Sequence, residues 1–262
     1  MIVGKYGGNP TGTGHPLIFE GGRSGWRQAE LSGVSGSLLS TDGEMAVGLG
    51  PAGLWLTRAG DVTWLSWPTG LEPVGVLDPQ VGLTDFASCV PGPRSPTCYA
   101  CGFDGPTRGR DVLLGMSDTG WNRMDTPWGD ADIGSLNAVA ITPTGALLVG
   151  GQEVVRPAEG QPGVAKAMLK LRSGEGQWTE IVLPNAAALA TVNDILVTAA
   201  GESFLACGSG AIHLVHMGPD APATDEGPGT AGRVTTLAEG PGGTIWAVGE
   251  ANGRALLLRR TP

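Results

Sequence analysis

Short apolar runs alternate along the chain with turns rich in Gly, Pro, Asp and Ser. One phrase, two apolar or small residues followed by Gly, recurs and ends at Gly4, Gly48, Gly102, Gly150, Gly208 and Gly249. The phrase therefore returns roughly every 40 to 60 residues, a spacing typical of four-stranded propeller blades. This pattern predicts an all-β repeat protein.

The context of the phrase repeats as well. An apolar run and a tight turn precede five of the phrases, as in AVAITPTGALLVG. A third apolar run follows, and a more polar fourth run carries tryptophan, as in QWTEIVLP. Four strands that rise in polarity suit a blade whose inner strand is buried and whose outer strand meets solvent. Four tryptophans at the outer run are expected to pack between outer strands: Trp26, Trp64, Trp121 and Trp178.

The chain is therefore predicted to be one all-β domain, a β-propeller of about six four-stranded blades, with five to seven allowed. The units run roughly over residues 1–32, 33–69, 70–129, 130–186, 187–230 and 231–262. In the fifth unit, GPDAPATDEGPGTAG stands where the outer strand belongs and is predicted to be a loop.

The two ends of the chain leave the closure of the ring open. The first unit begins at its second strand, MIVGKYG, and the last ends after its third, RALLLRRTP. A closed ring normally completes its split blade with strands from both ends. Three explanations remain: an upstream segment of the natural chain, a partner strand that completes the ring, or a wrong strand assignment at one end.

Composition and charge narrow the class of protein. The 45 glycines and 20 prolines accompany 41% apolar residues, which fits many turns between short strands and not a disordered chain. The formal charge is −9 and only 16 Lys and Arg are present, scattered along the chain, so no nucleic-acid partner is expected. No apolar run is long enough to span a membrane, and the N-terminal MIVGKYGGNP does not read as a signal peptide.

The turns before the outer tryptophans resemble a degenerate Asp-box. They occur at Met116–Met124, Arg172–Glu180, Gly22–Gln28 and Arg58–Trp67, and none keeps the full Ser-x-Asp-x-Gly-x-x-Trp spacing. The chain thus resembles the sialidase-type, or BNR-like, repeat propellers. In those families the box holds a hairpin on the outside of the wheel, so the resemblance implies architecture and not catalysis.

The third unit also resembles secreted repeat propellers of the actinobacterial type. In those units Ser-Cys ends the inner strand, a second Cys precedes the phrase and a Trp follows, as Ser88, Cys89, Cys98 and Trp121 do in this chain. The resemblance implies an extracellular or cell-envelope protein, with a cytoplasmic one as the alternative. Only this unit keeps both cysteines.

Three of the four cysteines lie close together, which raises three interpretations. A zinc site is disfavoured because Cys98 and Cys101, three apart on a strand, face opposite sides. A thioredoxin-like motif would need a strand followed by a helix. A disulfide needs only that Cys89 and Cys98 face each other across a hairpin, and it is the favoured interpretation. Cys101 and Cys207 stand at the Val position of the phrase and are expected to be small buried hydrophobes.

Histidines give no metal site either, since His213 and His216 also lie three apart on a predicted strand. Two loops, residues 103–111 and 127–134, are expected at one end of the propeller axis, where propellers bind ligands. They supply the candidate ligand-binding residues Asp104, Arg108, Arg110, Trp128, Asp130 and Asp132. Plain solvated connectors are the alternative interpretation of the same loops.

These observations favour a non-catalytic recognition or scaffolding module for a protein or glycan partner. The alternative is a glycoside hydrolase or lyase that uses Asp104 with Asp130 or Asp132. Sialidase chemistry is disfavoured because the only tyrosines are Tyr6 and Tyr99, and Tyr99 lies on a strand beside the cysteines. No G-x-S-x-G elbow or P-loop is present. No catalytic residue, cofactor or metal is assigned.

Overall fold

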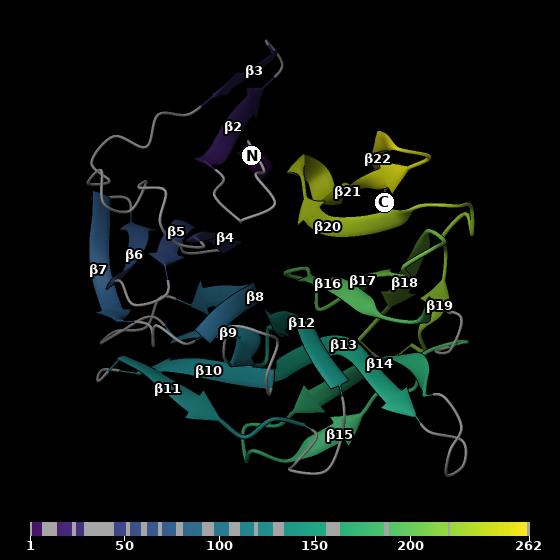
Figure 1. The fold of residues 1–262 in the computed structure, drawn as a ribbon, viewed down its shortest axis with the longest axis horizontal. Coiled ribbons are helices and arrows are strands. Elements are labelled where there is room, and N and C mark those ends of the chain that lie inside the picture. The colour runs from purple at the N-terminus through teal and green to yellow at the C-terminus, as the bar shows by residue number, and fades with distance from the viewer. Residues whose placement is uncertain are drawn as a thin grey trace.

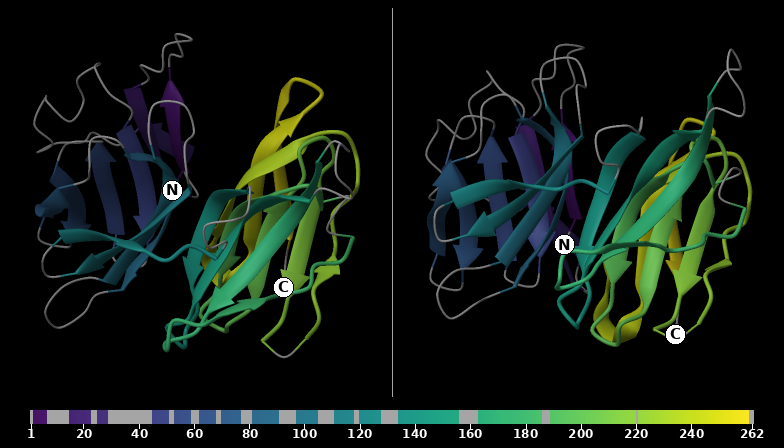
Figure 2. Two further views of the ribbon diagram at one scale, coloured as in Figure 1. Left: turned by 60° about the horizontal axis from the view of Figure 1, so that its bottom comes forward. Right: turned by 90° about the horizontal axis from the view of Figure 1, so that it is seen from below.

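The chain folds into a ring of small antiparallel sheets in a computed structural model (Figure 1). The structure describes residues 2–6, 15–22, 25–28, 45–50, 53–58, 62–67, 70–76, 81–90, 97–104, 111–117, 120–127, 134–155, 163–185, 189–219 and 221–260. Figure 1 shows the sheets following one another around a common centre, and the side views of Figure 2 show most strands running across the thickness of the ring. This arrangement is a β-propeller, as predicted.

Each sheet is a meander in which consecutive strands pair. The first sheet holds β1 (Ile2–Tyr6), β2 (His15–Gly22) and β3 (Gly25–Gln28). The second holds β4 (Met45–Gly50), β5 (Gly53–Arg58), β6 (Val62–Trp67) and β7 (Gly70–Val76). The third holds β8 (Val81–Val90), β9 (Thr97–Asp104), β10 (Asp111–Ser117) and β11 (Gly120–Met124).

The C-terminal half continues the same plan. The fourth sheet holds β12 (Gly134–Ile141), β13 (Leu147–Val155), β14 (Val164–Arg172) and β15 (Trp178–Glu180). The fifth holds β16 (Val192–Val197), β17 (Ser203–Cys207), β18 (His213–Met217) and β19 (Thr224–Asp225). The last holds β20 (Arg233–Glu239), β21 (Ile245–Ala251) and β22 (Arg254–Arg260), with a short 3-10 turn, η1 (Pro241–Gly243), between β20 and β21.

Within the described residues, both end sheets have three strands, as the sequence predicts. The first sheet begins with the phrase strand β1, and the last ends with the third strand β22. The fifth sheet has an outer strand of only two residues, β19, within the segment predicted to be a loop. One detail differs from the predicted units: residues 70–76 form β7, which pairs with β6 in the second sheet.

The inner strands repeat one irregularity. Each of β12, β16 and β20 has a register shift around one extra residue: Asn137, Asn193 and Thr235. After the shift, Val139 pairs with Val149, Ile195 with Leu205, and Leu237 with Ala247. These pairs define equivalent positions in the three sheets.

Apolar side chains fill the space between neighbouring sheets. One cluster joins the third and fourth sheets through residues such as Cys101, Leu113 and Val149. Others join the fourth sheet to the fifth and the fifth sheet to the last. Because strand residues alternate between faces, each sheet buries one set of side chains against the preceding sheet and another against the following one. Trp178 packs against the cluster between the third and fourth sheets, and Trp121 packs against Ala100, Val112 and Leu114 of its own sheet. The side chains of Trp26 and Trp64 lie outside the described residues.

The two described cysteine side chains, Cys101 and Cys207, are buried, as predicted, but they do not occupy equivalent positions. Both have 0% exposure. The registers align Cys101 with Ala206, while Cys207 aligns with Gly151 and Gly249. Burial raises the pKa of Cys207 far above its ordinary value. The three-residue phrase therefore shifts by one or two positions between units, which the sequence alone conceals.

Candidate interaction surface

One leucine position of the third strand repeats in four sheets. Leu113, Leu169, Leu214 and Leu257 pair with equivalent residues of the second strand. Leu113 and Leu169 have 0% exposure, and Leu214 packs against the cluster between the fifth and last sheets. Leu257, in contrast, is 59% exposed. The first three leucines are covered by the following sheet, and the last sheet leaves this position open.

The neighbours of Leu257 on the same side of the last sheet share its exposure. Trp246 and Val248 of β21 are half-buried, whereas the equivalent Phe204 and Ala206 of the fifth sheet are buried at 5% and 0% exposure. The guanidinium of Arg259 lies 6.0 Å from the centroid of the Trp246 ring. This surface, called the open face, consists of Thr236, Ala238, Trp246, Val248, Leu257 and Arg259.

The last sheet also has an unpaired outer edge. β22 pairs with β21 on one side, and no described strand pairs with its other side. In the third, fourth and fifth sheets, a fourth strand occupies that place: β11, β15 or β19. The exposed N–H and C=O groups of an edge strand are a template for pairing with another strand.

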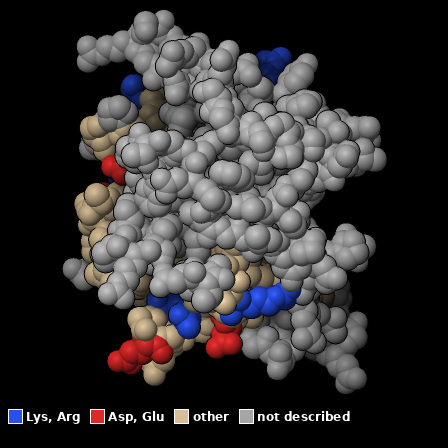
Figure 3. Space-filling model, turned by 90° about the vertical axis from the view of Figure 1, so that its left-hand side faces the viewer, with Lys and Arg blue, Asp and Glu red and all other residues tan. Residues whose placement is uncertain are grey.

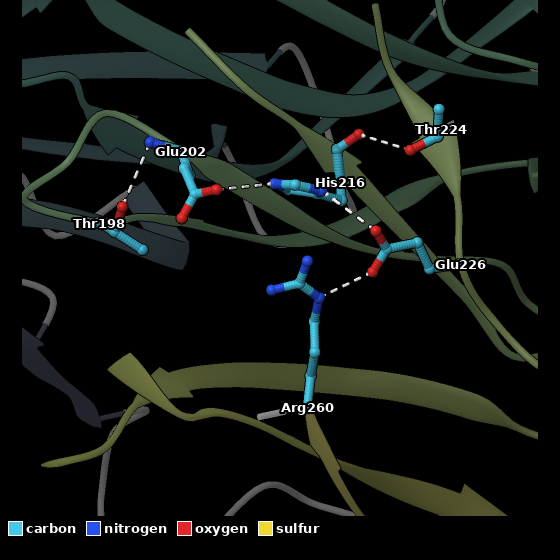
Figure 4. A network of polar contacts seen from close by, with 6 residues as sticks. All are labelled: Thr198, Glu202, His216, Thr224, Glu226 and Arg260. Carbon is cyan, nitrogen blue, oxygen red and sulfur yellow. Dashed lines mark hydrogen bonds and ion pairs between the residues drawn. The ribbon is translucent and has the colours of Figure 1, made fainter. Parts of the chain in front are cut away.

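A polar network fixes the end of β22 to the fifth sheet (Figure 4). The Nε of Arg260 donates to Oε2 of Glu226 at 2.8 Å. The other oxygen of Glu226 lies 3.1 Å from Nδ1 of His216, and Oε1 of Glu202 lies 3.3 Å from Nε2 of the same ring. Thr224 donates its hydroxyl to the His216 carbonyl at 3.4 Å. The network thus ties β22 to the β16–β17 turn, to β18 and to the residue after β19.

Ring contacts add to this network. The rings of His216 and Phe204 stack with centroids 4.7 Å apart, and the Arg260 guanidinium lies 5.0 Å from the Phe204 ring centroid. Burial raises the pKa of Glu226, but the hydrogen bond and charge of Arg260, together with His216, lower it more, so its net pKa is below the ordinary value. The carboxylate is held ionised beside Arg260.

The inner strands carry a second set of polar contacts. Asp194 follows the extra residue of β16, and its two oxygens accept the N–H groups of Ile195 at 2.8 Å and Leu237 at 2.6 Å. Asn193 donates to Gly208 O at 2.8 Å and to Val234 O at 3.0 Å. Burial raises the pKa of Asp194 to about 6, although both N–H donors act to lower it. These side chains join the inner strands of the fifth and last sheets.

The fourth and fifth sheets are joined in the same way by Asn137, which donates to the Thr191 hydroxyl at 2.9 Å and to Val192 O at 3.3 Å. Sequence reasoning missed both this set and the open face. For the polar contacts of the inner strands, the sequence signal is a recurring triplet in which Leu or Val is followed by Asn or Thr. It reads LNA at 136–138, VND at 192–194 and VTT at 234–236. For the open face, the sequence offers only the third-strand leucine of RALLLRR, which looks like its counterparts in the other units.

The ligand-binding residues predicted from sequence fall largely outside the described residues. Asp104 ends β9, where its backbone pairs with Val81, and its side chain is not described. The other five also lie outside the described residues: Arg108, Arg110, Trp128, Asp130 and Asp132. Their gathering at one end of the propeller axis stays a prediction.

The cysteine hairpin is described only in its backbone. Ala87 pairs with Tyr99 and Val90 with Thr97, so Ser88 and Cys89 together lie opposite Cys98. Both cysteine side chains lie outside the described residues, and the disulfide stays a prediction.

Within the described part of the chain, no group of three or more His, Cys, Asp and Glu side chains is arranged to hold a metal. His213 instead lies with its Nδ1 2.7 Å from Oδ2 of Asp225. On the face drawn in Figure 3, described basic side chains at the lower edge lie beside acidic ones and form no continuous basic patch. No helix of the described residues is long and apolar enough to cross a membrane.

Comparison with known proteins bears on the fold. No protein-family model matches the chain, and no curated protein matches it significantly. An α-L-arabinanase of Penicillium chrysogenum, solved with arabinobiose, matches with a TM-score of 0.59 and 14% identity, over 99% of this chain and 89% of that one. A protein classed with gluconolactonases matches with a TM-score of 0.55 and 16% identity, over 86% of this chain and 79% of that one. The chain has the β-propeller fold. At such identities the similarity extends to the fold alone.

Proposed function

We propose that the chain is a non-catalytic recognition or scaffolding module that binds a protein or glycan partner through the open face. The observation that carries this proposal is Leu257, 59% exposed at a position where Leu113 and Leu169 are 0% exposed. An apolar side chain that the repeat normally buries is here available to another molecule.

The chemistry beside Leu257 suits recognition. Trp246 and Arg259 lie against each other on the open face, and Trp and Arg are the residue types that most often dominate binding energy in interfaces. The network of Glu226 and Arg260 holds β22 in place from the other side of the sheet. Such preorganisation lowers the entropic cost of binding.

The alternative, a glycoside hydrolase or lyase, depends on Asp104 with Asp130 or Asp132 on the loops. It would need two carboxyl groups about 5 to 10 Å apart around a substrate. Among the described residues, Asp194 is the carboxylate on the inner strands with a raised pKa, and both its oxygens are engaged by backbone N–H groups. Its contacts are therefore those of a structural group.

A turnover assay separates the two functions. The purified chain is incubated with an arabinan, a panel of other polysaccharides and a gluconolactone, and no turnover above a heat-inactivated sample is expected. Turnover that Asp130→Asn or Asp132→Asn abolishes, while Leu257→Asp leaves it unchanged, would establish the hydrolase and overturn the binding proposal.

A binding assay tests the open face directly. Glycan and protein arrays are probed with the wild type, with Leu257→Asp and with Val182→Asp. Val182 is 83% exposed and lies after β15 in the fourth sheet, so it is a matched control for placing a charge at an exposed apolar site. Leu257→Asp should lose the bound ligands and Val182→Asp should keep them. Equal loss in both variants would contradict the proposal.

We further infer from the resemblance to secreted Asp-box-like propellers that the chain works outside the cytoplasm with a Cys89–Cys98 disulfide. The backbone register, which places Ser88 and Cys89 together opposite Cys98, supports this pairing. Mass spectrometry of alkylated protein, with and without reductant, should show two alkylated thiols before reduction and four after it. Four free thiols in protein never exposed to reductant would contradict the disulfide.

A further inference from the structure

We propose that the outer edge of β22 binds an extended, acidic segment of a partner protein, which adds to the last sheet as its fourth strand. The inference rests on the proposed recognition function and names its partner class. It is argued from how the chain's own outer strands are held.

The pairing registers make the third strands comparable residue by residue. Val149, Leu205 and Ala247 are equivalent, and they pair with Lys170, Val215 and Leu258. Lys170 lies opposite Glu180 on its outer side, and Val215 lies opposite Asp225. In the fourth and fifth sheets, an acidic residue of the outer strand thus lies opposite the third-strand position that Leu258 occupies in the last sheet.

The residues before those acids repeat too. Thr179 lies opposite Leu171 in the fourth sheet, and Thr224 lies opposite His216 in the fifth. Leu171 and His216 occupy the third-strand position that Arg259 has in the last sheet. In the fourth sheet, Trp178 then lies opposite Arg172, the equivalent of Arg260. The fourth sheet therefore holds an outer strand that reads Trp-Thr-Glu, and the fifth holds one that reads Thr-Asp.

Two basic side chains of β14 hold the outer strand of the fourth sheet. Nζ of Lys166 lies 3.5 Å from Oε1 of Glu180, and the Arg172 guanidinium lies 6.0 Å from the Trp178 ring centroid. The registers place Arg254 and Arg260 of β22 at the positions of Lys166 and Arg172. β22 therefore repeats the basic pair of β14, with no described strand for that pair to hold.

The charge of the outer strand follows that of the third strand. β14 contains Lys166, Lys170 and Arg172, and it pairs with a strand that carries Glu180. β10 contains no Lys or Arg, and its outer strand β11 has Arg123 at the place of Glu180. β22 contains Arg254, Arg259 and Arg260. By the same complementarity, its missing neighbour is acidic.

Among the arginines of β22, Arg254 is available for this role. Arg254 is exposed and has no ion pair within the described ranges, whereas Lys166 also binds Glu153 at 2.8 Å. The place of Glu153 is taken by Ala251 in β21. Arg260 is already oriented by Glu226. Because β15 and β19 are only three and two residues long, a short extended segment suffices to fill the edge.

The test uses a probe taken from the chain itself, the capped peptide GQWTEIVLP of residues 176–184. Its binding to the full chain is followed by fluorescence anisotropy of a labelled copy. Arg254→Glu should weaken binding roughly tenfold, because an attractive charge contact becomes repulsive. Arg233→Glu makes the same charge change at an exposed site of β20 and should leave binding unchanged. A peptide with Lys in place of its Glu should recover affinity for Arg254→Glu.

Two further measurements locate the peptide. A peptide with Pro in place of Thr should not bind, because it lacks an N–H for strand pairing; in the fourth sheet the neighbouring Ile181 N–H donates to Leu169 O at 2.9 Å. Hydrogen exchange should show new protection in residues 254–260 when the peptide binds. Absence of binding, protection elsewhere, or equal weakening by Arg254→Glu and Arg233→Glu would overturn the proposal.

The outcomes also separate this inference from the function on which it rests. If the peptide fails while Leu257→Asp abolishes binding of an array ligand, the edge proposal is wrong and the recognition function stands. Glycan or lactone turnover by the loop carboxylates would overturn the recognition function itself. Self-association that Arg254→Glu abolishes, measured by sedimentation at increasing concentration, would assign the edge to a second copy and overturn the acidic partner.

Discussion

The fourth sheet and the last sheet place a leucine at the same point of the third strand and expose it very differently. Leu169 has 0% exposure and Leu257 has 59%. The two strands share register, pairing and alternation, so the difference lies in what covers each side chain: Leu169 belongs to the cluster between the fourth and fifth sheets, whereas Leu257 belongs to none of the described clusters. The repeat decides which side chain stands at a position, and the place of the sheet in the ring decides whether that side chain stabilises the fold or meets a partner.

The largest expected effect comes from truncating these two leucines. Leu169→Ala should lower the free energy of unfolding by about 2 to 5 kcal/mol, because it opens a cavity in a packed cluster. Leu257→Ala should change it by no more than about 0.5 kcal/mol, because solvent already reaches the side chain. Urea denaturation of both variants measures the difference.

Equal destabilisation by the two substitutions would contradict the comparison, since it would mean that the open face is covered in solution. A partner offers a second check. If the open face binds a ligand, saturating ligand should raise the stability of the wild type more than that of Leu257→Ala, because only binding to the folded state adds to stability.

Asp194 gives the next effect, at the inner strands that join the fifth sheet to the last. Its pKa is raised from 3.8 to about 6 by burial, so the folded chain holds this proton over a range where the unfolded chain releases it. This contribution to stability therefore falls as the pH rises from about 4 to about 6, by up to roughly 3 kcal/mol. Asp194→Asn, which carries no charge at any pH, should flatten this slope in unfolding experiments between pH 4 and 7.

Asp194→Ala separates the charge from the hydrogen bonds. It removes the acceptor of the Leu237 N–H, held at 2.6 Å, and should cost about 1 to 3 kcal/mol at pH 4, where burial of charge no longer matters. If Asp194→Ala and Asp194→Asn were equally stable at pH 4, the carboxyl would not join the two inner strands.

The sequence predicts the architecture well because its signal is a repeat. The recurring phrase, the turns and the outer tryptophans locate the strands of the third, fourth and fifth sheets, and the chain ends predict that the first and last sheets have three strands. It places residues 70–76 in the third unit, because the strand β7 carries no phrase and its pairing with β6 is a tertiary property.

The sequence predicts the candidate surface poorly for a physical reason. The third-strand leucines look alike in the sequence, and only the packed ring shows that Leu257 is uncovered. Likewise, Asp194 reads as an ordinary strand residue until the structure shows its carboxylate beside the Leu237 N–H of the next sheet. Acidic and basic loop residues attract attention in a sequence, whereas an exposed apolar residue of a repeat does not.

The smallest expected effect concerns the network that holds the end of β22. Glu226 has a lowered pKa and is partly exposed, so its pair with Arg260 should contribute about 0 to 1 kcal/mol. The sign follows from the shift: the contribution is present at neutral pH and is lost as the pH falls below 4.5 through the lower folded pKa. Glu226→Gln should therefore lose a little stability at pH 7 and less as the pH falls below 4.5, as measured by urea denaturation at low salt.

Glu175→Gln is the matched control, since it makes the same change at an exposed residue of the β14–β15 turn, away from β22. A double-mutant cycle of Glu226→Gln with Arg260→Gln isolates the pair. If the cycle gives no coupling energy, Arg260 is held by its contact with the Phe204 ring. Packing, and not the ion pair, would then hold the end of β22 in its conformation. Raised salt would in that case weaken binding of the acidic peptide only by screening the contacts between the peptide and Arg254.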